Sequence, residues 1–117
     1  GSRIGVYIPK TYKNAGTVHI CEGESDTAAM LGQGFNTVGR SSCLTGSKIF
    51  KSLLSKNDDI IVIADNDKIG QRSACELVTY LGGDNTASAC FIPKEYKDVR
   101  EFVNSGKFDK AIFKGVK

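Results

Sequence analysis

The sequence predicts an α/β fold in which a mainly parallel sheet of about four strands carries helices on both faces. Two observations predict this class. Short apolar or β-branched runs alternate with segments of helical periodicity, which favours right-handed crossovers between parallel strands. The strongest run, Ile60 to Ala64, is uninterrupted, as is typical of a central parallel strand covered on both faces.

Each element is assigned from its own residue pattern and from the residues that end it. Apolar or β-branched runs mark strands, apolar residues at helical spacing mark helices, and glycine, proline or acidic residues end them. The expected elements, in chain order, are a strand at 17–21, a helix from 24 or 25 to 31, a strand at 35–38, a helix at 49–56, a strand at 59–65, a helix at 69–81, a strand at 86–92 and short helices at 99–103 and 111–113.

In the first half of the chain, the first strand stops at Glu22-Gly23, a pair that predicts a turn. A helix follows at once, because Asp26 favours a first helical turn and Gly32 lies where the apolar stripe ends. The next strand is a brief apolar run. A loop with several serines separates it from a segment whose apolar residues recur at helical spacing.

In the second half, the strongest strand ends on Asp65. The helix after it is closed by Gly82-Gly83, and the fourth strand stops at the breaker Pro93. The spacing of Val99 and Phe102 indicates a further short helix.

Residues 1–16 are predicted to form an N-terminal extension or an edge strand, and residues 17–117 one compact domain. Gly1-Ser2 resembles the remnant of a cleaved tag, so we expect the chain to be a piece of a longer protein. No apolar run reaches the roughly 18 residues that cross a bilayer. With no signal peptide at its start, the chain is expected to be cytoplasmic, with no membrane partner.

Composition excludes some kinds of site. With 40% apolar and 25% charged residues, the chain has the balance of a globular protein. Its net charge of +3 is too small to indicate nucleic-acid binding by itself. The single histidine is His19 and no cysteines stand in CxxC spacing, so no zinc site is predicted. The cysteines are expected to be reduced: Cys21, Cys43, Cys75 and Cys90.

Acidic residues follow two of the predicted strands. Glu22 ends the first strand, and Asp65 with Asp67 ends the third. Active sites of open α/β sheets form at the carboxyl ends of strands, and carboxylates are ligands that Mg²⁺ prefers. An isolated Asp-Asn-Asp is more often a turn or a helix N-cap. Two acidic motifs after two strands of one sheet favour a metal site.

These motifs resemble the Toprim family, the domain shared by bacterial-type primases, type IA and type II topoisomerases, recombination mediators and certain nucleases. The family pattern is an apolar strand ending in Glu-Gly, often with Asp three residues beyond the glycine, and a later strand ending in Asp-x-Asp. The matching segments run from Val18 to Asp26 and from Ile60 to Asp67, and the resemblance spans about residues 17 to 115. It implies a compact Toprim (Rossmann-like) fold that binds Mg²⁺, or Mn²⁺ in its place.

Two further features resemble the primase branch of the family, which includes phage and plasmid primase-helicases. Gly70 and Ala74 continue the Asp-x-Asp motif into a helix, and Lys97-Asp98 resembles a segment after the fourth strand. The resemblance implies metal binding and proton transfer by Glu22, metal binding by Asp65 and Asp67, auxiliary roles for Asp26 and Asp98, and contact with phosphates by Lys97.

Other cationic side chains are candidates for contact with backbone phosphate. Each is equally explained as a solvated charge or a loop residue. The candidates are Arg40, Lys68, Arg72 and Arg100.

The resemblance to primases implies a function in DNA replication. The expected reaction is nucleotidyl transfer, which makes RNA primers on single-stranded DNA from nucleoside triphosphates. The expected partners include other domains of a longer protein, with a helicase among the candidates. Three alternatives stay open: a Toprim nuclease or topoisomerase-type cleavage domain, a non-catalytic nucleic-acid-binding or partner-binding Toprim module, and, outside the family, a receiver-like signalling domain.

Overall fold

This computed structural model describes residues 6–41, 47–82 and 86–105. The helix expected at 111–113 lies outside the described residues. Among those residues, no helix is long and apolar enough to cross a membrane. The elements, in chain order, are β1 (Val6–Tyr7), β2 (Thr17–Glu22), α1 (Glu24–Gly32), β3 (Thr37–Arg40), α2 (Ser47–Leu53), β4 (Asp59–Ala64), α3 (Lys68–Leu81), β5 (Thr86–Phe91) and α4 (Val99–Asn104).

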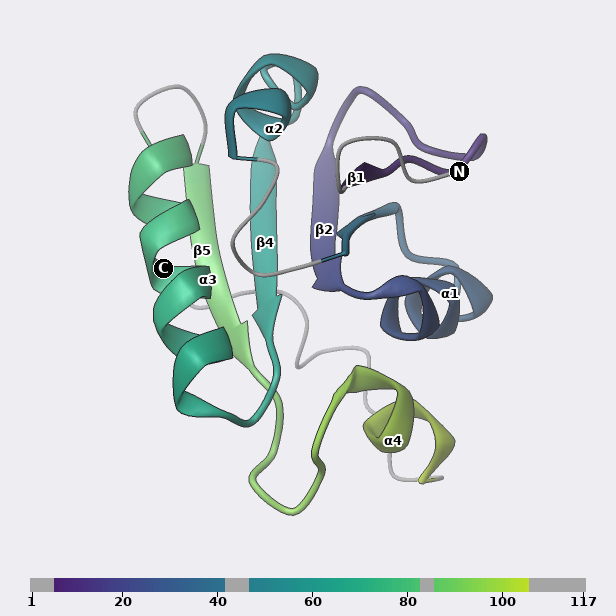
Figure 1. The fold of residues 1–117 in the computed structure, drawn as a ribbon. Helices are drawn as coiled ribbons and strands as arrows, with labels where there is room; N and C mark the ends of the chain where they lie inside the picture. Colours follow the sequence, from purple (N-terminus) through teal and green to yellow (C-terminus); the bar gives the residue numbers. More distant parts are fainter. Residues whose placement is uncertain (1–5, 42–46, 83–85, 106–117) are drawn as a thin grey trace.

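The strands of the described segments form one sheet in the order β1-β3-β2-β4-β5 (Figure 1). β2 pairs in parallel with both β3 and β4, and β4 pairs in parallel with β5. At one edge, the short β1 runs antiparallel to β3. The α/β class with a mainly parallel sheet is therefore confirmed. Within the described residues, β1 adds a fifth strand to the four expected.

β4 contributes to two cores, because successive side chains of a strand point to opposite faces. On one face, Ile60 and Val62 belong to a buried cluster with residues of α2 and α3. On the other, Ile61 and Ile63 belong to a cluster with residues of α1 and α4. All four side chains are at most 4% exposed. The expected cover of helices on both faces is thus confirmed (Figure 1).

The strand expected at 35–38 was placed too early, because β3 begins at Thr37. Gly34 has a φ of +88°, and the N–H groups of Gly34 and Phe35 donate to the carbonyls of Leu31 and Met30 at 3.0 and 3.2 Å. Both residues therefore still close α1, although Phe35 has the apolar side chain of a strand residue. As a result, Arg40 is the last residue of β3 rather than a loop residue after it.

Gly39 of β3 lies against α1. Thr27 of α1 is fully buried, and its hydroxyl donates to the carbonyl of Gly23 at 2.7 Å. A Cβ atom on Gly39 would meet the hydroxyl of Thr27 and would lie 3.2 Å from its Cβ. Glycine at this position lets the start of α1 lie close to the sheet.

We expect Gly39→Ala to lower the free energy of unfolding by about 1–3 kcal/mol, because the added methyl group overpacks a rigid contact. Gly32→Ala is the matched control, since a Cβ there meets nothing within 4 Å. Urea unfolding of both variants and the wild type measures the effect. Equal stability of Gly39→Ala and Gly32→Ala would contradict this account of the contact.

Candidate active site

The acidic residues that follow the strands gather at the carboxyl edge of the sheet. Glu22 is the last residue of β2, and Asp65 directly follows β4, which is the parallel neighbour of β2. Asp67 is the N-cap of α3, and Asp98 is the N-cap of α4. Asp26 lies in the first turn of α1. Parallel pairing thus brings together acids that are far apart in sequence.

Asp26 joins two of the elements around this edge. Its side chain is only 5% exposed, and its Oδ1 accepts a hydrogen bond of 3.1 Å from the N–H of Arg100 in α4. It also shares a hydrogen bond with the carboxyl group of Asp65. Burial raises the pKa of Asp26, while the hydrogen bonds from the Arg100 backbone and from Asp65 lower it. A buried acid therefore links α1, α4 and the end of β4.

Asp65 is the acid least favoured to ionise. Burial is the main cause that raises its pKa to about 8. The charge of Asp26, the hydrogen bond to it, and the charges of Glu22 and Asp98 raise this pKa further. At neutral pH the Asp65 carboxyl therefore holds a proton, and it is the donor to Asp26.

Glu22 lies beside a buried cation. Burial raises its pKa and the Arg40 guanidinium lowers it, while the charges of Asp67 and Asp26 raise it. Arg40 is opposite Glu22 in the β2–β3 register and is only 5% exposed. Its Nη2 donates to the hydroxyl of Ser73 on α3 at 3.3 Å. The structure thus places Arg40 inside the site, next to the acid.

Asp67 is both the N-cap of α3 and one of the acids at the carboxyl edge of the sheet. Its Oδ1 accepts a hydrogen bond of 2.5 Å from the N–H of Gly70. A Cβ on Gly70 would lie 3.0 Å from this oxygen, so glycine accommodates the cap. Asp98 caps α4 in the same way, through the N–H of Glu101 at 2.9 Å. The capping and metal-site interpretations of these acids are therefore compatible.

The remaining basic candidates are exposed around the site. Lys68 lies at the start of α3, and Arg72 on the same helix forms an ion pair of 3.5 Å with Glu76. That ion pair is at the solvent, because the two side chains are 86% and 72% exposed. Lys97 directly precedes the cap of α4, and Arg100 lies in the first turn of that helix. Arg40 thus lies within the acidic cluster, whereas Arg72 forms an ion pair with Glu76 of its own helix.

Sequence reasoning missed two residues of this edge. Asn66, between the two acids of the Asp-x-Asp motif, donates its side-chain amide to the carbonyls of Pro93 and Tyr96 at 2.6 and 2.5 Å. Ser73 accepts the hydrogen bond from Arg40. An asparagine at a strand end signals a turn, and a helical serine signals little, so neither pattern could reveal these partners.

The donor set fits a hard divalent cation. Among the described residues, no three carboxylate, thiolate or imidazole groups form a ready-made metal site. The acids nevertheless raise one another's pKa, as like charges do when no cation stands between them. Mg²⁺ commonly takes one or two protein carboxylates and completes its shell with water and substrate phosphates. Carboxylates at this edge match that requirement.

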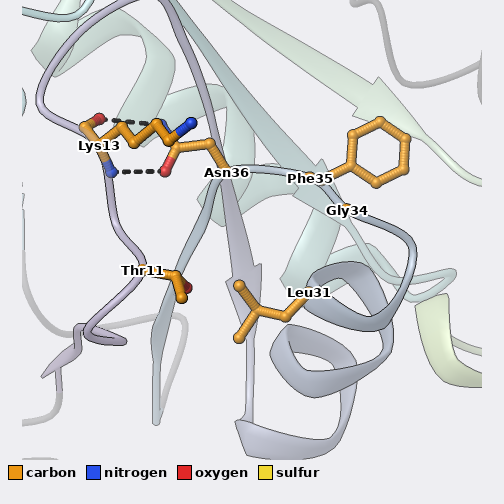
Figure 2. A pocket seen from close by; sticks show the side chains of 6 residues that line it. All are labelled: Thr11, Lys13, Leu31, Gly34, Phe35 and Asn36. Carbon is orange, nitrogen blue, oxygen red and sulfur yellow. Dashed lines mark hydrogen bonds between the residues drawn. The ribbon is translucent and has the colours of Figure 1, made fainter.

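A separate hollow lies on the side of the sheet where β3 begins, opposite the carboxyl ends that carry the acids. It has a volume of about 520 Å³, and Figure 2 shows the residues that line it: Thr11, Lys13, Leu31, Gly34, Phe35 and Asn36. Asn36 closes one wall, since its side chain accepts from the N–H of Lys13 at 2.8 Å and donates to the carbonyl of Lys13 at 2.9 Å. The hollow lies near the amino end of β3, away from the acids.

The structure is that of an α/β protein with a mainly parallel sheet, and acids lie at the carboxyl ends of its neighbouring strands β2 and β4. The chain belongs to the Toprim-like family, whose model matches residues 19–103. Both acidic motifs lie within that match. No curated protein matches the chain in sequence.

Solved primase structures share the fold. A DNA primase domain from Pseudomonas aeruginosa superposes with a TM-score of 0.66 at 21% identity, over 81% of this chain and 30% of that chain. A DnaG primase catalytic domain bound to ssDNA superposes with a TM-score of 0.65 at 22% identity, over 87% of this chain and 33% of that chain. The E. coli primase catalytic core superposes with a TM-score of 0.61 at 20% identity, over 81% of this chain and 31% of that chain. The chain thus spans about a third of the length of these proteins.

The protonated Asp65 predicts how stability depends on pH without metal. Its pKa rises from 3.8 to about 8 on folding, so the folded chain binds the extra proton between these values. Stability should therefore fall as the pH rises from 4 to 8. Asp65→Asn removes the carboxyl group that binds this proton, so we expect the free energy of unfolding to fall less over the same pH range. Urea unfolding in a chelator measures it.

Asp58→Asn is the matched control for this experiment. Asp58 is exposed and precedes β4, at the opposite end of the strand from Asp65. This variant should keep the pH dependence of the wild type. If Asp65→Asn also kept it, Asp65 would not carry a proton in the folded chain.

Proposed function

We propose that this chain is the metal-binding catalytic domain of a DNA primase-like protein, which joins ribonucleotides into RNA primers on single-stranded DNA. The observation that carries the proposal is a cluster of mutually interacting acids: Glu22 and Asp65 at the carboxyl ends of two paired strands, and Asp26 in the first turn of α1. Membership of the Toprim-like family and the shared primase fold support it. The rest of a longer protein, with a helicase as a candidate partner, would supply the remaining contacts to template and nucleotide.

Asp65, Asp67 and Glu22 are the residues that would hold Mg²⁺ or Mn²⁺. Toprim domains generally bind Mg²⁺. When bound, the metal neutralises charge on the phosphate and orients the attacking and leaving oxygens. Asp26 is less accessible than the other acids, since it is buried and bonded to α4. In this proposal it positions Asp65, and Asp98 organises the start of α4.

Glu22 is the acid best suited to accept a proton from an attacking hydroxyl. Its raised pKa brings the carboxylate closer to the range in which general bases are effective. Arg40 beside it favours the ionised form, which a base requires. The exposed cations at the rim, Lys68, Lys97 and Arg100, would contact phosphates of nucleotide or template.

The metal ligands can be tested by binding. We expect Asp65→Asn and Asp67→Asn each to weaken Mn²⁺ affinity by at least about tenfold, because each removes a carboxyl group that would bind the ion in its deprotonated form. Titration of Mn²⁺ followed by electron paramagnetic resonance measures the free ion directly. Asp58→Asn should bind like the wild type. Unchanged affinity in both site variants would remove the proposed metal site.

The reaction can be tested in the longer protein to which this domain is proposed to belong. We expect Glu22→Gln to lower the rate of template-dependent primer synthesis by about 10²- to 10⁴-fold, as loss of a general base does. Asp58→Asn should synthesise primers at the wild-type rate. Undiminished synthesis by Glu22→Gln would count against a role for this acid. Metal-dependent cleavage of DNA by the wild type, without primer synthesis, would favour the nuclease alternative.

A further inference from the structure

Asn66 joins two loops at the acidic edge. Its side-chain Nδ2 donates to the carbonyls of Pro93 and Tyr96, and its backbone N–H donates to the carbonyl of Lys97 at 3.1 Å. All three acceptors lie in the segment between β5 and α4. One residue thus makes three hydrogen bonds to a segment that lies about thirty positions further along the chain.

The two loops joined in this way both carry acids. The first loop bears Asp65 and Asp67 on either side of Asn66. The second leads directly to Asp98, the N-cap of α4. The hydrogen bonds of Asn66 to Pro93, Tyr96 and Lys97 hold these two loops against each other. The distances between these acids therefore depend on the contacts that hold the two loops together.

The side-chain chemistry of asparagine suits this position. Its amide nitrogen carries two N–H donors, and here they meet two carbonyl oxygens of one turn. That turn is closed by the N–H of Tyr96, which donates to the carbonyl of Pro93 at 3.1 Å. Aspartate would set a carboxylate against the same carbonyls, and alanine would leave them without these donors.

We propose that Asn66 is a positioning residue, which fixes the Asp65-Asp67 loop against the loop before α4 and so sets the geometry in which the acids bind a divalent cation. This inference rests on the proposed metal-binding function. Residues that orient metal ligands commonly change metal affinity by about 10- to 100-fold when they are removed. Asn66 contributes through the loop and not as a ligand itself.

The chain offers a matched control at the opposite end of the sheet. Asn57 is 2% exposed, and the two N–H groups of its Nδ2 are shared among the carbonyls of Lys13, Ala15 and Gly16 at 3.2, 3.2 and 3.3 Å, while its Oδ1 accepts from the Tyr12 hydroxyl at 2.7 Å. It therefore also joins two segments of the chain through its amide, but it lies before β4 rather than after it. Asn57→Ala removes at least as many side-chain hydrogen bonds as Asn66→Ala, without touching the acids.

The experiment measures Mn²⁺ affinity and thermal stability for the wild type, Asn66→Ala and Asn57→Ala. Both variants should melt at a lower temperature than the wild type. Asn66→Ala should bind Mn²⁺ about 10- to 100-fold more weakly, whereas Asn57→Ala should keep wild-type affinity. Amide exchange at Tyr96 should be faster in Asn66→Ala and unchanged in Asn57→Ala. If Asn66→Ala does not fold, Asn66→Ser replaces it, with weaker binding expected again.

The outcomes separate this inference from the function on which it rests. Wild-type affinity in a folded Asn66 variant would overturn the positioning role and leave the metal site standing. Equal losses of affinity in Asn66→Ala and Asn57→Ala would also overturn it, because the effect would then follow from lowered stability. A wild-type chain that binds no Mn²⁺ would overturn the proposed metal site and this inference with it.

Discussion

The parallel pairing of β2 with β4 is the constraint on which the candidate site depends. It sets the carboxyl ends of the two strands at one edge, so that Glu22 and Asp65 face a common space. The same pairing requires that β4 be covered on both faces, since it is the inner strand between β2 and β5. The two buried clusters that cover it fix the strand, and thereby fix where its terminal acid lies.

The acidic edge is electrostatically unfavourable by itself. Burial and like charges raise the pKa of Asp65, Glu22 and Asp26, so the folded chain concentrates groups that resist ionisation. A bound proton relieves this at neutral pH, and a divalent cation would relieve it more fully. Strain of this kind is expected where a site is shaped for a ligand, and the apolar cores offset its cost.

Much of the fold could be predicted because apolar periodicity reports which face of an element is buried. The run from Ile60 to Ala64 predicted a strand covered on both sides, and its residues pack in two cores. The start of β3 could not be placed in this way. Phe35 has a strand-like side chain, but its N–H closes the preceding helix, and a backbone hydrogen bond leaves no mark in a hydrophobic pattern.

The sequence by itself determined the order of strands and helices and the placement of Glu22, Asp65 and Asp67 at strand ends, because these follow from local patterns. Tertiary structure decided what surrounds the acids: it buried Asp26 against α4, drew Arg40 beside Glu22 and Ser73, and joined the Asp-x-Asp loop to the segment before α4. Those contacts depend on distances between segments remote in sequence, and such distances arise only when the sheet has assembled.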